Sequence, residues 1–86
     1  MADKIYGLID VDVSERCENG SYLVSRLAHE GEDGDADPVP WGDTEEHSDP
    51  EVALRSAKNL ADYVVGQRHA RRAVVFQGGR DVYCVP

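Results

Sequence analysis

Three aspartates with alternating spacing come nearest in this sequence to a known chemical motif. Asp33, Asp35 and Asp37 match the opening of a calcium-binding loop, in which alternate residues supply oxygens to one cation. The complete loop also needs a glycine at its sixth position and a glutamate at its twelfth, where this chain has Pro38 and Thr44. We therefore exclude an EF-hand and expect a solvated acidic loop. Weak, nonspecific binding of divalent ions is the alternative.

Histidines and cysteines offer a second route to chemistry, because both are zinc ligands and a cysteine paired with a histidine is a nucleophile. No C-x-x-C or H-x-x-x-H pair occurs, and no sequence signal links either cysteine to a histidine. A small domain with one helix also has little concave volume for a substrate. We predict no metal site, no cofactor, no catalytic residue and no enzyme activity. The residues concerned are Cys17, Cys84, His29, His47 and His69.

The three aspartates belong to an acidic segment, residues 29–48, that contains no lysine or arginine. Its low apolar content and dense like charge predict a mobile loop. Spaced carboxylates on such a loop imitate the phosphates of a nucleic-acid backbone and speed association with a basic partner by long-range attraction. We hypothesise that the loop contacts a basic surface of a host protein or nucleoprotein complex. The alternative is that it only keeps the protein soluble.

The one tryptophan, Trp41, lies among prolines and acids, outside any periodic apolar segment. Aromatic side chains in such loops anchor interfaces, and neighbouring prolines lower the entropic cost of ordering them. The alternative is that the ring folds back and caps an exposed end of the core. The candidate partner-binding residues are Asp33, Asp35, Asp37, Trp41, Glu45 and Glu46.

A basic patch follows the expected helix. It comprises Arg68, His69, Arg71 and Arg72, with Arg80 further along the chain. Such a patch can bind a phosphate or an acidic surface. The alternatives are that it balances the helix terminus and the acidic loop, or that it makes a dipolar molecule that self-associates.

Length and composition exclude several classes of protein. The 86 residues make one domain, residues 1–86, and 41% apolar residues suffice for one small core. A net charge of −8 argues against free nucleic acid or an anionic membrane as partner, because both would repel the protein. The chain has no apolar run of membrane-spanning length and no signal-peptide pattern, so we expect a cytoplasmic protein with reduced cysteines.

One amphipathic helix is predicted within residues 48–65. Ser48 or Asp49 can cap its first free N–H groups, and Pro50 stands where a missing donor costs nothing. Glu51 completes a capping box if Ser48 is the cap. Apolar residues then recur at helical spacing, and Gly66 follows where a left-handed residue is wanted.

Two glycine-containing turns divide the remaining apolar segments into hairpins. Asn-Gly at residues 19–20 and Gly-Gly at residues 78–79 suit tight turns, and the second would pair Val75 with Val82. A further strand near residues 39–41 is limited to an edge by its prolines. The main strands are predicted for residues 5–13, 21–28, 73–77 and 80–85.

The orientation of the second strand stays open, because either Tyr22 and Val24 or Leu23 and Leu27 can face the core. The elements predict an α+β fold in β-β-α-β-β order, with a mostly antiparallel sheet of four to five strands and one helix packed on one face. The expected core comprises Ile5, Ile9, Val11, Val13, Ala57, Leu60, Ala61, Val64, Val75 and Val82.

This order of elements resembles that of small phage anti-CRISPR proteins that inhibit multi-subunit, type I effector complexes. The resemblance rests on residues 19–22 (Asn-Gly-Ser-Tyr), residues 48–50 (Ser-Asp-Pro) before an alanine-rich helix, residues 73–76 (Ala-Val-Val-Phe) and residues 81–83 (Asp-Val-Tyr). It implies a phage-encoded inhibitor that acts in the host cytoplasm. The chain is also similar to small bacterial β-β-α-β-β domains of unassigned function. The alternative is therefore a housekeeping domain that forms a homodimer through an edge strand.

Overall fold

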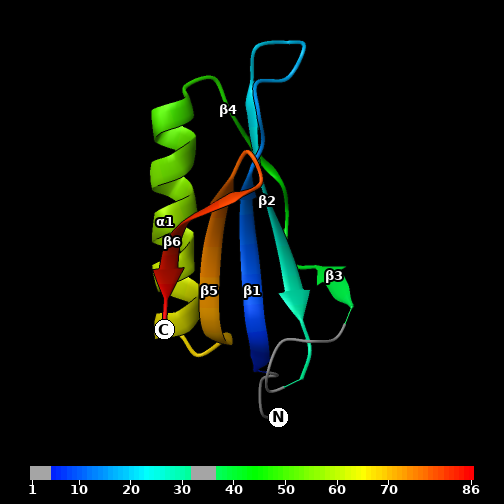
Figure 1. Ribbon diagram of the computed structural model, residues 1–86, viewed down its shortest axis with the longest axis vertical. Coiled ribbons are helices and arrows are strands. Elements are labelled where there is room, and N and C mark those ends of the chain that lie inside the picture. Colours follow the sequence, from blue (N-terminus) through cyan, green and yellow to red (C-terminus); the bar gives the residue numbers. More distant parts are fainter. Residues whose placement is uncertain (1–4, 32–36) are drawn as a thin grey trace.

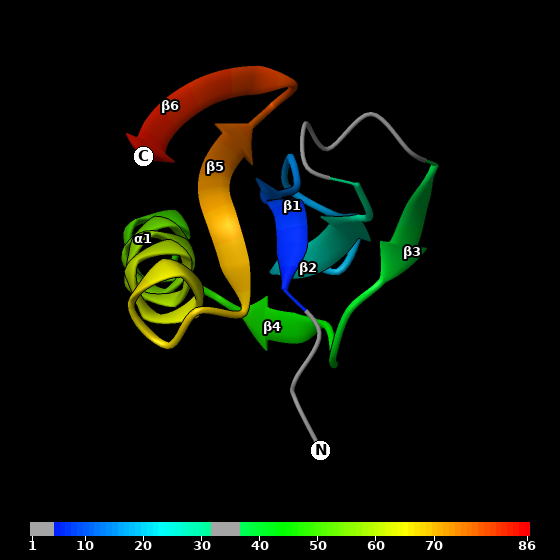
Figure 2. The same cartoon turned by 90° about the horizontal axis from the view of Figure 1, so that it is seen from below.

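A curved six-stranded sheet with one helix across one face makes up the fold, as the computed structural model shows (Figures 1 and 2). The structure describes residues 5–31 and 37–86. Its elements are β1 (Tyr6–Val13), β2 (Tyr22–His29), β3 (Pro38–Pro40), β4 (Glu45–His47), α1 (Pro50–Gly66), β5 (Ala70–Gln77) and β6 (Arg80–Val85). The strand order is β3-β2-β1-β5-β6, and β4 also pairs with β2. The α+β class is confirmed, with more strands than expected.

The sheet is mixed because β1 and β5, at its centre, run parallel, whereas the other neighbouring pairs are antiparallel. α1 begins at the end of the sheet where β1 finishes and returns to the end where β1 starts (Figure 1). There the Tyr6 N–H donates to the carbonyl oxygen of His69 at 2.9 Å. β5 therefore starts beside the start of β1 and runs in the same direction. The helix in the described part of the chain is neither long nor apolar enough to cross a membrane.

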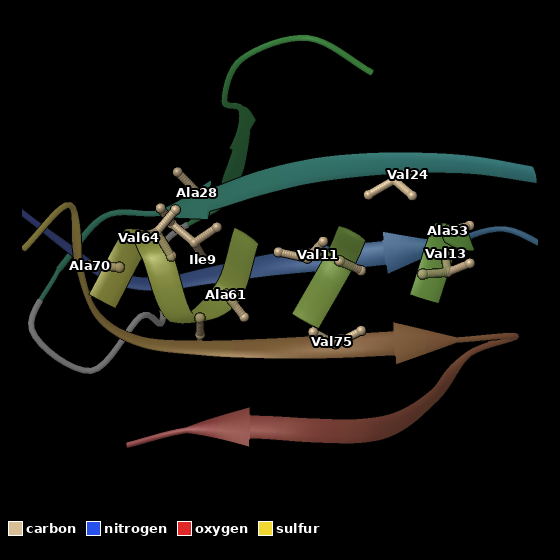
Figure 3. Packing of buried hydrophobic residues seen from close by; sticks show 12 residues of the cluster. Ile9, Val11, Val13, Val24, Ala28, Ala53, Ala61, Val64, Ala70 and Val75 are labelled. Carbon is tan, nitrogen blue, oxygen red and sulfur yellow. The ribbon is translucent and has the colours of Figure 1, made fainter. Parts of the chain in front are cut away.

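Alternate residues of β1 face α1 and form the centre of the core (Figure 3). Ile9 and Val11 are fully buried with the helix residues Ala57 and Ala61. Because these alanines are small, the helix lies close to the sheet. Neighbouring side chains fill the space between the helix and the sheet. The buried apolar residues are Ile9, Val11, Val13, Val24, Ala28, Ala53, Ala57, Ala61, Val64, Ala70, Ala73 and Val75.

Three of the expected core residues lie further out. Leu60 is only half-buried, although it packs against the core. Ile5 precedes β1 and is 51% exposed, and Val82 is 44% exposed. The prediction that Ile5 and Val82 are core residues is therefore wrong.

Val82 is exposed because a β-bulge changes the register of the last hairpin. Near the turn, Phe76 pairs with Asp81, as a two-residue turn requires. Beyond the bulge, Val75 pairs with Tyr83 instead of Val82. The extra residue in the bulged strand has no partner opposite it, and the predicted Val75–Val82 pair does not form.

The acidic segment contains two short strands instead of one continuous loop. β3 pairs with Leu27 to His29 and β4 pairs with Tyr22 to Val24, so both lie along the outer edge of β2. That edge has backbone groups that need partners, which explains why even polar residues pair there. The prolines at both ends of β3 fit this edge position, as the sequence indicated. β2 points Val24 and Ala28 into the core, the first of the two expected orientations.

Asp49 caps the start of α1: its Oδ1 accepts a hydrogen bond from the Glu51 N–H at 2.9 Å. At the other end, Gly66 is still helical, and the left-handed residue is Arg68 with φ of 61°. His69 N–H donates to Val64 O at 2.8 Å and Arg68 N–H to Val65 O at 3.1 Å, the Schellman pattern. The prediction of a left-handed Gly66 is therefore wrong.

Candidate partner-binding surface

The described carboxylates among the candidate residues do not form one surface. Asp33 and Asp35 lie outside the described residues. Asp37 is exposed just before β3, and Glu46 is exposed on β4. Pro38 pairs with His29 and Glu46 with Leu23, six residues apart on β2. At about 3.3 Å per residue, this places Asp37 and Glu46 roughly 20 Å apart along the sheet edge.

Glu45 is partly buried, because β4 alternates and turns this carboxylate toward α1 and β2. Its Oε1 accepts a hydrogen bond from Ser56 Oγ at 2.8 Å and lies 2.9 Å from His47 Nε2. Its Oε2 lies 3.4 Å from Nη2 of Arg26 on β2. The hydrogen bonds with His47 and then Ser56 lower the pKa of Glu45. Glu45 therefore ties β4 to the rest of the fold.

Trp41 packs against the edge of the core, which is the second of the two expectations for its ring. The Trp41 and His69 ring centroids are 5.5 Å apart, and those of His69 and Tyr63 are 5.9 Å apart. The Arg26 guanidinium lies 5.8 Å from the Trp41 ring centroid. Tyr63, at the outer end of this row, is 55% exposed. The row runs from Trp41, beside β2, to Tyr63 near the end of α1, and its Trp41 end packs against the core.

Exposed carboxylates gather instead at one end of the molecule, from three segments distant in sequence. The turn between β1 and β2, the strand β4 and the start of α1 all lie at this end (Figure 1). Residues 14–21 and 45–52 contain one arginine, Arg16, and no lysine. We call this surface the acidic end; its exposed acidic residues are Glu15, Glu18, Glu46, Asp49 and Glu51.

A shallow groove of about 390 Å³ crosses the acidic end. The Glu46 Oε2 accepts hydrogen bonds from Ser21 Oγ at 3.1 Å and from Asn19 Nδ2 at 3.3 Å. These contacts hold the carboxylate in place at the groove. The groove is lined by Cys17, Glu18, Asn19, Ser21, Leu23 and Glu46. Sequence reasoning predicted Glu46 as a partner-binding residue but did not place the first hairpin turn beside it. Only the pairing of β4 with β2 brings this turn and Glu46 together.

The sheet face away from α1 holds an acid–histidine pair that the sequence did not indicate. Asp10 Oδ2 on β1 lies 2.6 Å from His29 Nε2 at the end of β2. Burial, followed by the neighbouring Asp10 charge, raises the pKa of Asp12 on the same face. Within residues 5–31 and 37–86, no group of three or more histidine, cysteine, aspartate or glutamate side chains could hold a metal ion.

In comparisons with protein-family models, curated proteins and solved structures, nothing matches this chain. We therefore base the proposed function on the surface chemistry described above.

Proposed function

We propose that this protein is a small acidic binding protein that inhibits its partner by covering a basic, nucleic-acid-handling surface. The acidic end is the observation that supports this proposal. Five exposed carboxylates from three segments lie there, in a chain whose net charge is −8. Lysine and arginine side chains of the partner normally hold phosphates. Here they would meet carboxylates, which are negatively charged as phosphates are.

The fixed position of Glu46 favours binding, because a side chain that is already ordered loses little entropy when a partner docks. Its hydrogen bonds with Ser21 and Asn19 leave the other carboxylate oxygen, Oε1, for a partner cation. Asp49 already serves as the helix cap, so its contribution is mainly long-range attraction. Together these groups would speed association and make it sensitive to salt.

The resemblance to phage anti-CRISPR proteins suggests which partner to test. A type I effector complex holds nucleic acid on a basic surface, and an acidic protein on that surface would exclude DNA. On this proposal the chain contacts neither free nucleic acid nor a membrane. It acts as a competitor and needs no catalytic group.

The alternative, self-association through an edge strand, is disfavoured by features at both sheet edges. β6 is bulged at Val82 and begins with the charged residues Arg80 and Asp81. At the opposite edge, β3 starts and ends with proline. Bulges, charges and prolines all discourage the addition of another strand.

The proposal is tested by immobilising the protein and passing over it a lysate of bacteria that contain a type I effector complex. We expect the complex to be retained at low salt and released at high salt, with its DNA binding inhibited by the free protein. Recovery of only the protein itself at both salt concentrations would refute the proposal. Retention that is equal at low and high salt would also refute it, because the contact would not then be electrostatic.

A further inference from the structure

An open groove of about 420 Å³ lies at the other end of the molecule, beside the end of α1 and the start of β5. Its apolar surface comes from Ile5, Val65 and Ala70, and two arginines, Arg68 and Arg71, also line it. Arg68 and Arg71 are exposed, and Ile5 is half-exposed. The groove thus combines an apolar wall with guanidinium groups. Its volume falls in the range of small-molecule sites.

Arg68 adopts a backbone conformation that arginine rarely takes. Among the described residues it is the one non-glycine with positive φ, at 61°. A side chain in this region costs about 1 kcal/mol relative to glycine. Its guanidinium has no carboxylate within ion-pair distance in the part of the chain that the structure describes. The positive φ belongs to the Schellman pattern that ends α1, a position where glycine is usual, so the backbone alone does not favour an arginine there.

The C-terminal end of α1 carries partial negative charge, but it repels an anion in the groove only weakly. The Schellman pattern satisfies the carbonyls of Val64 and Val65, and Gln67 N–H donates to Tyr63 O at 2.8 Å. Three of the last four carbonyls of α1 therefore accept backbone hydrogen bonds, which reduces the partial negative charge at this end of the helix. Arg72, next to the groove in sequence, adds positive potential.

We propose that this groove binds small amphipathic anions, namely aliphatic carboxylates. The Arg68 guanidinium holds the carboxylate through paired N–H donors, and the aliphatic chain lies on Ile5 and Val65. Arginine suits this task because its planar fork matches both oxygens of a carboxylate. The apolar wall selects for a chain beyond the head group. The site lies away from the acidic end, so the two surfaces can act independently.

Titration with hexanoate, followed by NMR of the backbone amides, tests this site. We expect saturable shifts centred on Ile5, Val65 and Ala70, with a Kd on the order of 1 mM for so small a ligand in an open groove. Acetate lacks the chain and hexylammonium reverses the charge, so both should bind more weakly. Equal shifts with hexylammonium, or none with hexanoate, would overturn the proposal.

Arg68→Gly separates binding from folding, because glycine relieves the strain while removing the guanidinium. The variant should be at least as stable as the parent and should bind hexanoate about tenfold more weakly or worse. Arg80→Gln, which removes the same charge from the last hairpin, should bind like the parent. Unchanged affinity in Arg68→Gly, or an equal loss in Arg80→Gln, would contradict a site built on Arg68.

Discussion

Ser56 on α1 donates a hydrogen bond of 2.8 Å to Glu45 on β4, and this contact joins the helix to the edge of the sheet. The same carboxylate reaches His47 and Arg26. The polar segment 45–47 pairs with the open edge of β2, and the contacts of Glu45 hold the resulting strand in position against α1. That position places Glu46 beside the first hairpin turn and so assembles the acidic end.

Glu45→Gln should destabilise the protein by about 1 kcal/mol at neutral pH, because the charge-assisted contacts become neutral ones. Chemical denaturation measures this difference. Glu18→Gln is the matched control; its side chain is exposed and makes no hydrogen bond or ion pair within the described residues, so the change should be within about 0.5 kcal/mol. If the two variants lose equal stability, Glu45 does not tie β4 to the fold as described.

The low pKa of Glu45 also predicts a dependence of stability on pH. Hydrogen bonds with His47 and Ser56 lower the pKa in the folded state from its ordinary value of 4.5, so the unfolded chain binds this proton more readily. The stabilisation is complete above about pH 4.5 and is lost as the pH falls through the lower folded value. Denaturation curves at several pH values should therefore converge for the parent and Glu45→Gln in acid. Curves that stay parallel would contradict this origin of the shift.

Arg68→Gly should raise the free energy of unfolding by up to about 1 kcal/mol, because glycine adopts positive φ without strain. Arg68→Ala, which removes the side chain but keeps Cβ, should give little or no gain. Thermal or chemical denaturation of both variants separates these effects. A gain in both would assign the effect to charge instead of backbone conformation.

Gly42→Ala should destabilise the protein by about 1–2 kcal/mol. Gly42 has φ of 83°, where alanine is strained, and an added Cβ would lie 2.7 Å from Arg26 Nη1, so this guanidinium would have to shift. Gly66→Ala is the control, since this residue is helical and has open space around it. Alanine there should stabilise by about 0.5–1 kcal/mol. Chemical denaturation should give opposite signs for the two variants, and equal signs would contradict the described environments.

Ala57→Arg should be severely destabilising, by more than about 3 kcal/mol, because Ala57 is fully buried where α1 meets the sheet. Asn59→Arg places the same side chain on the exposed face of the helix and should change stability by less than about 0.5 kcal/mol. Melting temperatures of the two variants test the orientation of the helix. If Ala57→Arg melts like the parent, another helix face packs on the sheet.

Local signals in the sequence predicted the helix and the buried face of β1. The proline at the helix start and the small residues at helical spacing act within a few turns, and Ile9, Val11 and Val13 alternate with polar neighbours. Both patterns can be recognised without knowing which distant residues become neighbours in the fold. The α+β class follows from them, because one amphipathic helix and several short strands have few ways to bury their apolar faces.

Features that depend on distant pairing were missed. Glu45 to His47 carries no strand signal of its own and pairs only because β2 offers an open edge. The acidic end requires this pairing, so it was not visible in the sequence. The bulge at Val82 likewise requires β5 as a neighbour, and Gly66 looked like the helix stop although Arg68 takes that role.

The central claim is that the acidic end binds a basic partner surface. The most direct test compares the parent with Glu18→Lys/Glu51→Lys in binding to a type I effector complex, with Asp37→Lys/Asp43→Lys as a control of equal charge change on the segment that holds β3. We expect binding to be lost in the first double variant and largely kept in the second, with similar melting temperatures in all three proteins. Binding that is lost equally in both variants, or kept in the first, would contradict the claim.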